Sequence, residues 1–215
     1  MARPRRQDAR REHLVGAARS AILQRGLGAT RVRDIADQAG VATGTVTYYF
    51  RELDELFDLV FAEAVDRFCT DRERLADAHG DPGRQLTAVL RSGLPTGPDD
   101  ELCYLLYEFS PQARHRPGDA LLRKQLYERQ VALYRRILVD GAECGAFTLR
   151  SPAGQVAANL VALEDAYGYH VIAQTSVQRH EAERHLFGYA TLATSTPLPS
   201  PAETPHGGTD RSGHQ

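Results

Sequence analysis

Hydroxyl-bearing side chains gather in one short stretch of the chain, at Thr43, Thr45, Thr47 and Tyr48. A threonine or tyrosine hydroxyl can hydrogen-bond a phosphate oxygen or the edge of a base, and a threonine methyl group can pack on the methyl group of thymine. The chemistry that this stretch offers is therefore recognition of DNA, provided that the chain presents all four side chains on one surface.

The surrounding residues 30–50 predict the elements that would present them. They predict a short helix, a tight turn at Gly40 and a second short helix, because glycine adopts the positive φ of such a corner without a steric penalty. Apolar residues at helical spacing would form one buried seam, leaving the hydroxyls on the opposite face. This pattern is typical of a helix-turn-helix, although an ordinary helical hairpin is the alternative. The apolar residues are Val32, Ile35, Ala36, Ala39, Val41, Val46 and Phe50.

The same stretch resembles the DNA-binding segment of the TetR family of bacterial transcriptional repressors. The family pattern runs, loosely, V-R-D-I-A-x-x-A-G-V-S-x-G-T-L-Y-x-Y-F. The resemblance covers about the first 60 residues, and beyond them only the helical layout is similar. It implies an all-α fold, with a three-helix helix-turn-helix head on a larger helical domain for ligand binding and dimerisation. The matching residues are Val32-Arg33-Asp34-Ile35-Ala36, Ala39-Gly40-Val41, Gly44-Thr45-Val46 and Tyr49-Phe50.

Carried over residue by residue, the resemblance implies a set of DNA contacts. Arg33 is the best candidate for a base contact, since a guanidinium can pair bidentately with guanine. Tyr48 and Tyr49 are expected to bind phosphates. The chain departs from the family pattern at Ala42, at Thr47 and at Leu53, where serine, tyrosine and lysine are usual, and Arg51 is expected to replace the lysine's phosphate contact. The full predicted set is Arg31, Arg33, Thr43, Gly44, Thr45, Thr47, Tyr48 and Tyr49.

Charge is distributed unevenly along the chain. The 215 residues carry a net charge of −2, which alone argues against a nucleic-acid partner. Residues 1–50, however, carry a net charge of +5 and the remainder −7. A basic head on an acidic body is expected of a protein that meets phosphates at one end.

Composition and motifs exclude several other classes of protein. The chain has no nucleophile elbow, Walker loop, dinucleotide fingerprint or HExxH motif, so an enzyme is not expected. No cofactor or metal is expected, since His170 has no second ligand at metal spacing. The widely separated cysteines Cys69, Cys103 and Cys144 are expected to be buried in a reducing compartment. Without an apolar run of about 20 residues or a signal segment, the predicted location is the cytoplasm, with no membrane partner.

Helical periodicity and Pro/Gly punctuation divide the rest of the chain. We expect helices at about 8–25, 52–79, 82–93, 98–114, 118–143, 152–175 and 178–194, and a disordered Pro/Gly/Ser-rich tail at 195–215. Thr30 is predicted to cap the first helix of the helix-turn-helix, and Ser151 is predicted to cap the helix at about 152–175. Leu75, in the long helix after Phe50, is predicted to be buried. The predicted domains are 1–51 for DNA binding, 52–194 for ligand binding and dimerisation, and 195–215 for the tail.

Tyrosines and carboxylates in the central helices suggest a site for an effector. In the family the central helices enclose an effector cavity, and tyrosine combines an apolar ring with a polar tip. Glu108, Glu164 and Asp165 could hold a cationic or polyol-like ligand, although each tyrosine could instead be part of the core and each carboxylate could instead face solvent. The predicted ligand residues are Tyr104, Tyr107, Glu108, Tyr127, Tyr134, Tyr167 and His170.

The last two helices, at about 152–175 and 178–194, are expected to pair with their symmetry mates in a homodimer, as they do in the family. Two heads about 34 Å apart would then read a palindromic operator on double-stranded DNA. The resulting prediction is a repressor that a small-molecule effector releases from its operator. The alternative is a helix-turn-helix activator, or a regulator controlled by a protein partner.

Overall fold

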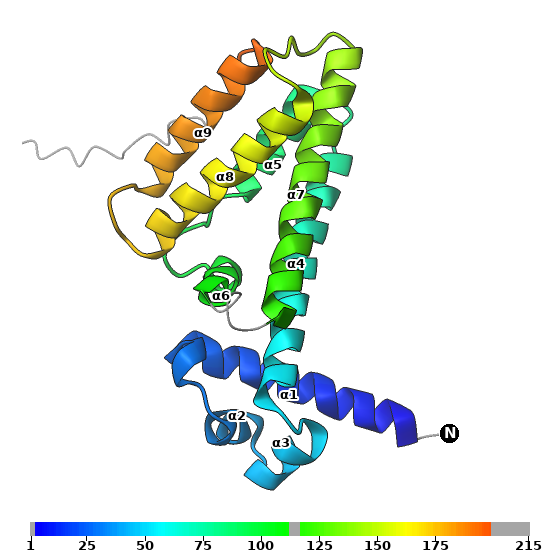
Figure 1. Cartoon of the computed structure of the whole chain (residues 1–215), viewed down its shortest axis with the longest axis vertical. Coiled ribbons are helices and arrows are strands. Elements are labelled where there is room, and N and C mark those ends of the chain that lie inside the picture. Colours follow the sequence, from blue (N-terminus) through cyan, green and yellow to red (C-terminus); the bar gives the residue numbers. More distant parts are fainter. Residues whose placement is uncertain (1–2, 112–116, 199–215) are drawn as a thin grey trace, which may run out of the picture.

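The computed structural model describes residues 3–111 and 117–198, and over these ranges it contains helices and no strand (Figure 1). The all-α prediction is confirmed. The helices are α1 Arg3–Arg25, η1 Leu27–Ala29, α2 Val32–Ala39, α3 Thr43–Tyr49, α4 Leu53–Asp77, α5 Pro82–Ser92, α6 Glu101–Glu108, α7 Pro117–Glu143, α8 Ala153–Ile172 and α9 Arg179–Thr194.

Helices α1–α3 form a small head around one apolar core. Leu14, Ala18 and Ile22 on α1 are fully buried, as their helical spacing predicts. They pack against Ile35 of α2, and the apolar seam continues across the turn to Val46 of α3. The predicted helix-turn-helix is therefore present, with both of its helices held against α1.

The corner of the helix-turn-helix depends on Gly40. This residue has φ 63° and ψ 39°, and the Val41 amide beyond it donates to the Ala36 carbonyl at 3.0 Å. A side chain at position 40 would meet no neighbour within 4 Å, so the left-handed backbone rather than lack of space favours glycine.

Both N-caps predicted from serine and threonine are wrong. Arg31 occupies the cap of α2, where its amide donates to Asp34 at 2.8 Å, while the hydroxyl of Thr30 is buried and donates to the Gly26 carbonyl. Pro152, not Ser151, caps α8. At each of these two positions the residue that follows the predicted cap is still in extended conformation, so the helix begins one residue later.

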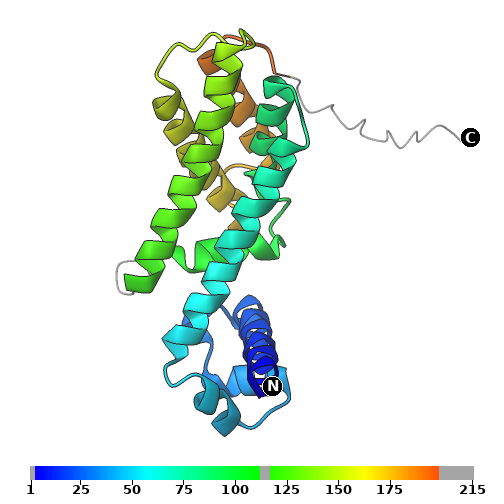
Figure 2. The same cartoon turned by 90° about the vertical axis from the view of Figure 1, so that its right-hand side faces the viewer.

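Helix α4 runs from the head into the body and belongs to both (Figures 1 and 2). It lies beside α7 along most of its length, while α8 and α9 lie side by side on the opposite edge of the body. Short helix α6 lies between the head and the body and contacts α1, α4 and α8. The arrangement places the head at one end of an elongated molecule.

The core of the body includes charged residues, among them an arginine of α4 that the apolar pattern did not predict. Arg72 of α4 is 2% exposed, whereas Leu75, predicted to be buried, is 41% exposed. Position 72 follows Phe68 and precedes Ala76 at intervals of four, so it lies on the buried face. The side chain at this position is therefore buried whether or not it is apolar.

The remaining differences concern element ends. The helix predicted at 98–114 is α6, which ends at Glu108, and residues 112–116 lie outside the described residues. Of the tail predicted to be disordered, residues 195–198 are described and Leu198 is buried, while 199–215 lie outside. Cys69 and Cys103 are buried as predicted, but Cys144 is exposed. Among the described helices, none is both long enough and apolar enough to cross a membrane.

Candidate functional site

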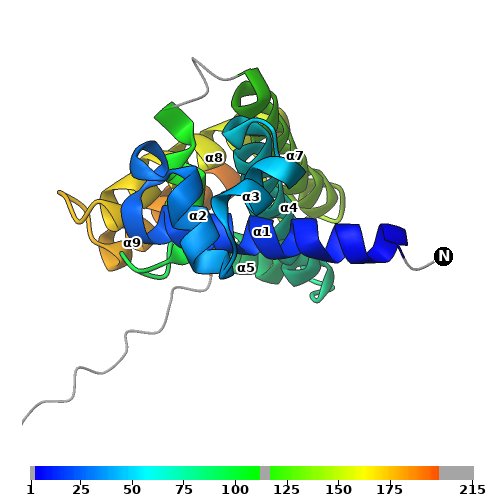
Figure 3. The ribbon, with the colours of Figure 1, turned by 90° about the horizontal axis from the view of Figure 1, so that it is seen from below.

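Helix α3 presents the predicted hydroxyl face at the end of the molecule farthest from α8 and α9 (Figures 1 and 3). Thr43, Gly44 and Thr47 are exposed, Thr45 is half-buried, and Tyr48 is 75% exposed. Such exposure of a tyrosine leaves both its ring and its hydroxyl free to meet a partner. Tyr49 is half-buried and packs against the head core, with its ring edge-on to Tyr48 at 5.2 Å.

The orientation of α3 is fixed from its carboxyl-terminal end by a residue that sequence reasoning missed. Arg11 of α1 donates to the Tyr49 carbonyl at 2.9 Å, pairs with Glu55 of α4 at 2.9 Å, and stacks over the Phe50 ring at 4.3 Å. Its guanidinium therefore joins three segments at the point where α3 ends. A signal was available only in the excess of arginine in residues 1–50, which does not distinguish this arginine from its neighbours.

The two predicted arginines of α2 differ in what their side chains do. Arg33 is solvent-exposed and lies 3.9 Å from Asp37, a surface ion pair that contributes little and leaves the guanidinium available. The guanidinium of Arg31 instead donates to the carbonyls of Gly28 and Thr30 at 2.8 and 3.0 Å. Arg31 therefore also stabilises the loop before α2, and because the residue is exposed its contact with DNA stays a prediction.

A buried ion pair crosses the centre of the body. Arg72 of α4 pairs with Glu164 of α8 at 2.8 Å, and both side chains are 2% exposed. The guanidinium also donates to Gln130 at 2.7 Å, to the Val89 carbonyl at 3.2 Å and to the Tyr134 hydroxyl at 3.0 Å. Tyr134 donates to Glu164 in turn. Through these contacts α4, which carries the head, is joined to α5, α7 and α8.

The electrostatics of this cluster are set by burial. Removal from water raises the pKa of Glu164 to about 7, and the adjacent Arg72 opposes that rise. Gly93 leaves room for the carboxylate, since a Cβ there would lie 1.7 Å from Glu164 Oε1. The cluster is thus closely surrounded, and none of its polar groups faces solvent.

A small interior cavity lies next to the cluster, with a volume of about 20 Å³. That is enough for one water molecule. Asp165 lies on its wall, where burial raises the pKa of this carboxyl against the charges of Arg123 and Arg72. The lining residues come from α4, the end of α5, α6, α7 and α8: Phe68, Gly93, Cys103, Leu106, Tyr107, Arg123, Leu126, Gln130 and Asp165.

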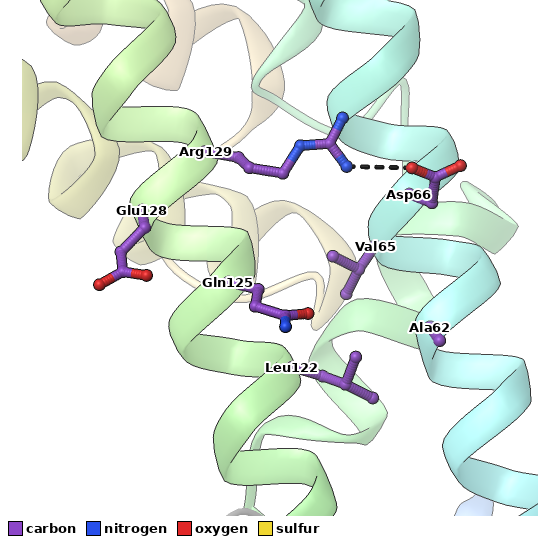
Figure 4. Close-up of a pocket in the computed structure, with 7 residues that line it drawn as sticks. All are labelled: Ala62, Val65, Asp66, Leu122, Gln125, Glu128 and Arg129. Carbon is purple, nitrogen blue, oxygen red and sulfur yellow. Dashed lines mark hydrogen bonds and ion pairs between the residues drawn. The ribbon is translucent and has the colours of Figure 1, made fainter.

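A larger hollow of about 270 Å³ lies on the surface between α4 and α7 (Figure 4). It is open to solvent, and Arg129 in its lining pairs with Asp66, also in the lining, and with Glu73 beyond it, each at 3.0 Å. None of the predicted ligand residues lines it. We therefore regard the smaller interior cavity as the better candidate for a ligand site.

The structure does not bring the seven predicted ligand residues together. Tyr107 lines the interior cavity, and its hydroxyl donates to the Asp165 carbonyl at 3.2 Å. Tyr134 belongs to the ion-pair cluster beside it. Tyr127 is 46% exposed, Tyr167 stacks on His185 at 5.5 Å, and His170 contacts Thr175 at 2.5 Å. Tyr104 and Glu108 face the head, where the Glu108 carboxylate accepts from the Leu27 amide at 2.7 Å.

The outer faces of α8 and α9 expose apolar and small residues. On α9, Leu192 is 71% exposed and Gly188, one turn earlier, is exposed. On α8, Ala162 and Ala166 are exposed, and Tyr169 is 56% exposed with its ring 6.2 Å from that of Tyr107. Within the described part of the chain, the helices that α9 contacts substantially are α8 and α5. The opposite face of α9 is therefore uncovered. A partner that covers this face would bury apolar surface.

Comparison with known proteins agrees with the geometry of the head. Residues 14–60, which span most of α1 through the start of α4, match the model of the bacterial regulatory proteins of the tetR family. The repressor KstR2 of Mycolicibacterium smegmatis is 30% identical over 86 residues, which is 40% of this chain and 42% of that protein. The regulator BetI of Burkholderia ambifaria is 26% identical over 161 residues, or 74% of this chain and 80% of that protein.

Solved structures share the fold over most of the chain. A transcriptional regulator of Rhodococcus sp. Rha1 superposes with a TM-score of 0.74 at 23% identity, covering 89% of this chain and 99% of that one. A transcriptional regulator of Saccharomonospora viridis in complex with choline gives a TM-score of 0.78 at 20% identity, covering 85% and 95%. At these identities the likeness concerns the fold alone.

An all-helical body behind an exposed helix-turn-helix defines a DNA-binding transcriptional regulator. Its head, at residues 14–60, matches the tetR family of bacterial regulatory proteins, and the chain is similar to transcriptional regulators over a longer stretch. The relatives that it matches are transcriptional regulators rather than enzymes, and repressors are among them.

Proposed function

We propose that this protein is a repressor that binds a palindromic operator as a homodimer in the cytoplasm and is released by a small-molecule effector. The observation that carries the proposal is the exposed hydroxyl face of α3, held in place by Arg11 at the end of the molecule. The proposed head is residues 1–51, and the proposed body for ligand binding and dimerisation is residues 52–194.

The uncovered faces of α8 and α9 support the proposed dimer. A two-fold axis through these faces would cover Leu192 and Tyr169 with the same surface of a second copy. It would also join two heads in one particle, and a single head of this size makes few DNA contacts. Pairing of heads on two half-sites accounts for tight and specific binding.

Tyr48 and Arg33 are expected to divide positioning from sequence readout. Changing Tyr48 to phenylalanine removes one phosphate contact per head and should weaken binding to all DNA sites about equally, by roughly 5–30-fold. Changing Arg33 to alanine should instead relax sequence preference by about 1–3 kcal/mol per half-site. Selection of binding sites from a random duplex library measures the sequence preference. Fluorescence anisotropy on strongly and weakly selected sites then measures the affinity.

Arg74 provides a matched control for the arginine substitution, since it is exposed on α4 away from the head and pairs with Asp71 of the same helix at 3.5 Å. Arg74→Ala should leave affinity and preference unchanged. A change of preferred sequence in Tyr48→Phe would contradict the assigned roles. The absence of binding to any duplex at low salt would contradict the proposed function itself.

The proposed effector binds at the interior cavity. The Asp165 carboxylate with the rings of Phe68 and Tyr107 suits an organic cation, and a fold neighbour was crystallised with choline. At a hundred times its Kd a ligand contributes about 2.7 kcal/mol, which raises Tm by about 5–10 °C in a chain of this size. Choline, tested first in a thermal-shift panel of small cations and polyols, is expected to give such a rise, and Asp165→Asn should reduce it. If no compound in the panel raises Tm, control by a protein partner becomes the better hypothesis.

A further inference from the structure

Two opposite charges in the wall of the interior cavity are not paired with each other. Arg123 of α7 and Asp165 of α8 both line the cavity, and both residues are half-buried. The charge of Arg123 lies close enough to oppose the rise in the pKa of Asp165 that burial causes. In the part of the chain that the structure describes, however, no ion pair or hydrogen bond joins the two side chains. The cavity therefore presents a cation and an anion at once.

Helical spacing explains why Arg123 lies on the cavity wall. Arg123, Leu126 and Gln130 follow one another on α7 at intervals of three and four, and all three line the cavity. Tyr134, four positions further on, belongs to the buried ion-pair cluster. Arg123 thus continues the inner face of α7 from the cluster toward the amino-terminal end of the helix.

The buried ion-pair cluster does not neutralise the Asp165 carboxylate. Its own charges, Arg72 and Glu164, pair with each other at 2.8 Å, and Glu164 also accepts from Tyr134. The backbone carbonyl of Asp165 accepts from Tyr107, whereas among the described residues no donor is bonded to its carboxylate. A charge withdrawn from water is costly unless an opposite charge pairs with it. A ligand that carries both signs would pair with both Asp165 and Arg123.

The rest of the cavity wall is largely apolar. Phe68 of α4, Leu106 of α6 and Leu126 of α7 lie on it, so methyl and methylene groups suit the middle of a ligand. The volume of about 20 Å³ must increase for such a molecule. The half-exposed Arg123 has no hydrogen bond or ion pair within the described ranges, so its long side chain can swing outward while its charge stays near the ligand. This movement enlarges the cavity at the loss of few contacts.

We propose that the effector is a compact zwitterion, whose ammonium group binds the Asp165 carboxylate and whose carboxylate binds the Arg123 guanidinium. A guanidinium binds a carboxylate through two parallel hydrogen bonds, which gives geometric specificity as well as affinity. Arg123 is then the residue that distinguishes a zwitterion from a simple organic cation. The inference rests on the effector site of the proposed function, which requires only that a cation binds there.

Isothermal titration calorimetry of the full-length protein tests the inference with probes that differ in one group. Choline and glycine betaine share a trimethylammonium group, but choline ends in a hydroxyl and glycine betaine in a carboxylate. γ-Butyrobetaine and its alcohol analogue repeat the comparison with a longer linker, and tert-butylacetate has the shape of glycine betaine without its positive charge. At least one zwitterion should bind about ten times more tightly than its alcohol analogue, and about ten times more tightly than tert-butylacetate.

Variants at Arg123 assign the difference to this side chain. Arg123→Gln should weaken binding of the zwitterion about tenfold and leave binding of the alcohols within about twofold of the wild type. Arg135→Gln makes the same change at an exposed arginine of α7 and should leave every affinity unchanged. Should Arg123→Gln fail to fold, Arg123→Lys keeps the charge but loses the paired hydrogen bonds, and should still weaken binding of the zwitterion more than that of its alcohol analogue.

Two results would overturn the inference alone: alcohols that bind as tightly as the zwitterions, or an Arg123→Gln substitution that weakens both classes equally. In either case the cation site of the proposed function still stands. If none of the probes binds the wild-type protein, that site fails as well, and the inference fails with it.

Discussion

Replacing Arg72 with methionine is expected to lower the free energy of unfolding by about 3–5 kcal/mol. The guanidinium donates to Glu164, Gln130, Tyr134 and the Val89 carbonyl in a fully buried setting. Methionine fills much of the volume but leaves the Glu164 carboxylate without its counter-charge. Urea unfolding at fixed protein concentration, monitored by circular dichroism, measures the loss.

Two further variants test whether the buried pair is the cause. Adding Glu164→Gln to Arg72→Met removes the uncompensated charge and should restore part of the lost stability. Arg74→Met, two positions along α4 but exposed, should cost less than about 0.5 kcal/mol. If Arg72→Met and Arg74→Met lower the free energy of unfolding equally, the buried ion pair contributes no more to stability than an exposed arginine.

The pH dependence of stability gives an independent check of the same cluster. In the folded protein the pKa of Glu164 is about 7, above the ordinary 4.5, so the folded state binds this proton more tightly than the unfolded chain. The corresponding stability is fully present below pH 4.5 and is lost as pH rises to about 7, by on the order of 3 kcal/mol. The Glu164→Gln variant should lack this part of the dependence of the free energy of unfolding on pH. In Arg72→Met the opposing charge is gone, so the loss should continue above pH 7.

Leu192→Glu is expected to convert the protein to a monomer and to weaken operator binding by about 10²–10⁴-fold. Leu192 is the most exposed large aliphatic side chain of α9 and lies on the face that we propose is covered by a second copy. A two-fold axis would place two new carboxylates in one apolar interface, where burial of each charge is costly. Separate heads would then lose the gain in affinity that comes from linkage.

Sedimentation velocity gives the oligomeric state of this variant, and fluorescence anisotropy on a selected operator gives its affinity. Leu121→Glu on α7 makes the same change at a residue of similar exposure outside α8 and α9, and should leave both measurements unchanged. A Leu192→Glu protein that remains dimeric and binds its operator fully would place the dimer interface elsewhere.

The head was predictable because its determinants are local. The apolar spacing in α1 and α2, the left-handed Gly40 and the hydroxyls of α3 each concern residues within a few turns of one another. Helical periodicity reports such neighbours directly. For the same reason the helices of the body were predicted in number and order, while several ends and caps were displaced by a residue or more.

The interior of the body was decided by tertiary structure. The sequence analysis did not single out Arg72, whose buried partner Glu164 lies 92 positions away. Glu108 was assigned to a ligand site but meets the Leu27 amide 81 positions earlier, and Tyr127 turned out to face solvent. Residue types and spacing within one helix determine which side is buried, so they predicted the helix-turn-helix, and the resemblance of these residues to a known family implied a regulator. Which charged group meets which depends on how separate helices pack, and that information is absent from the period of any one of them.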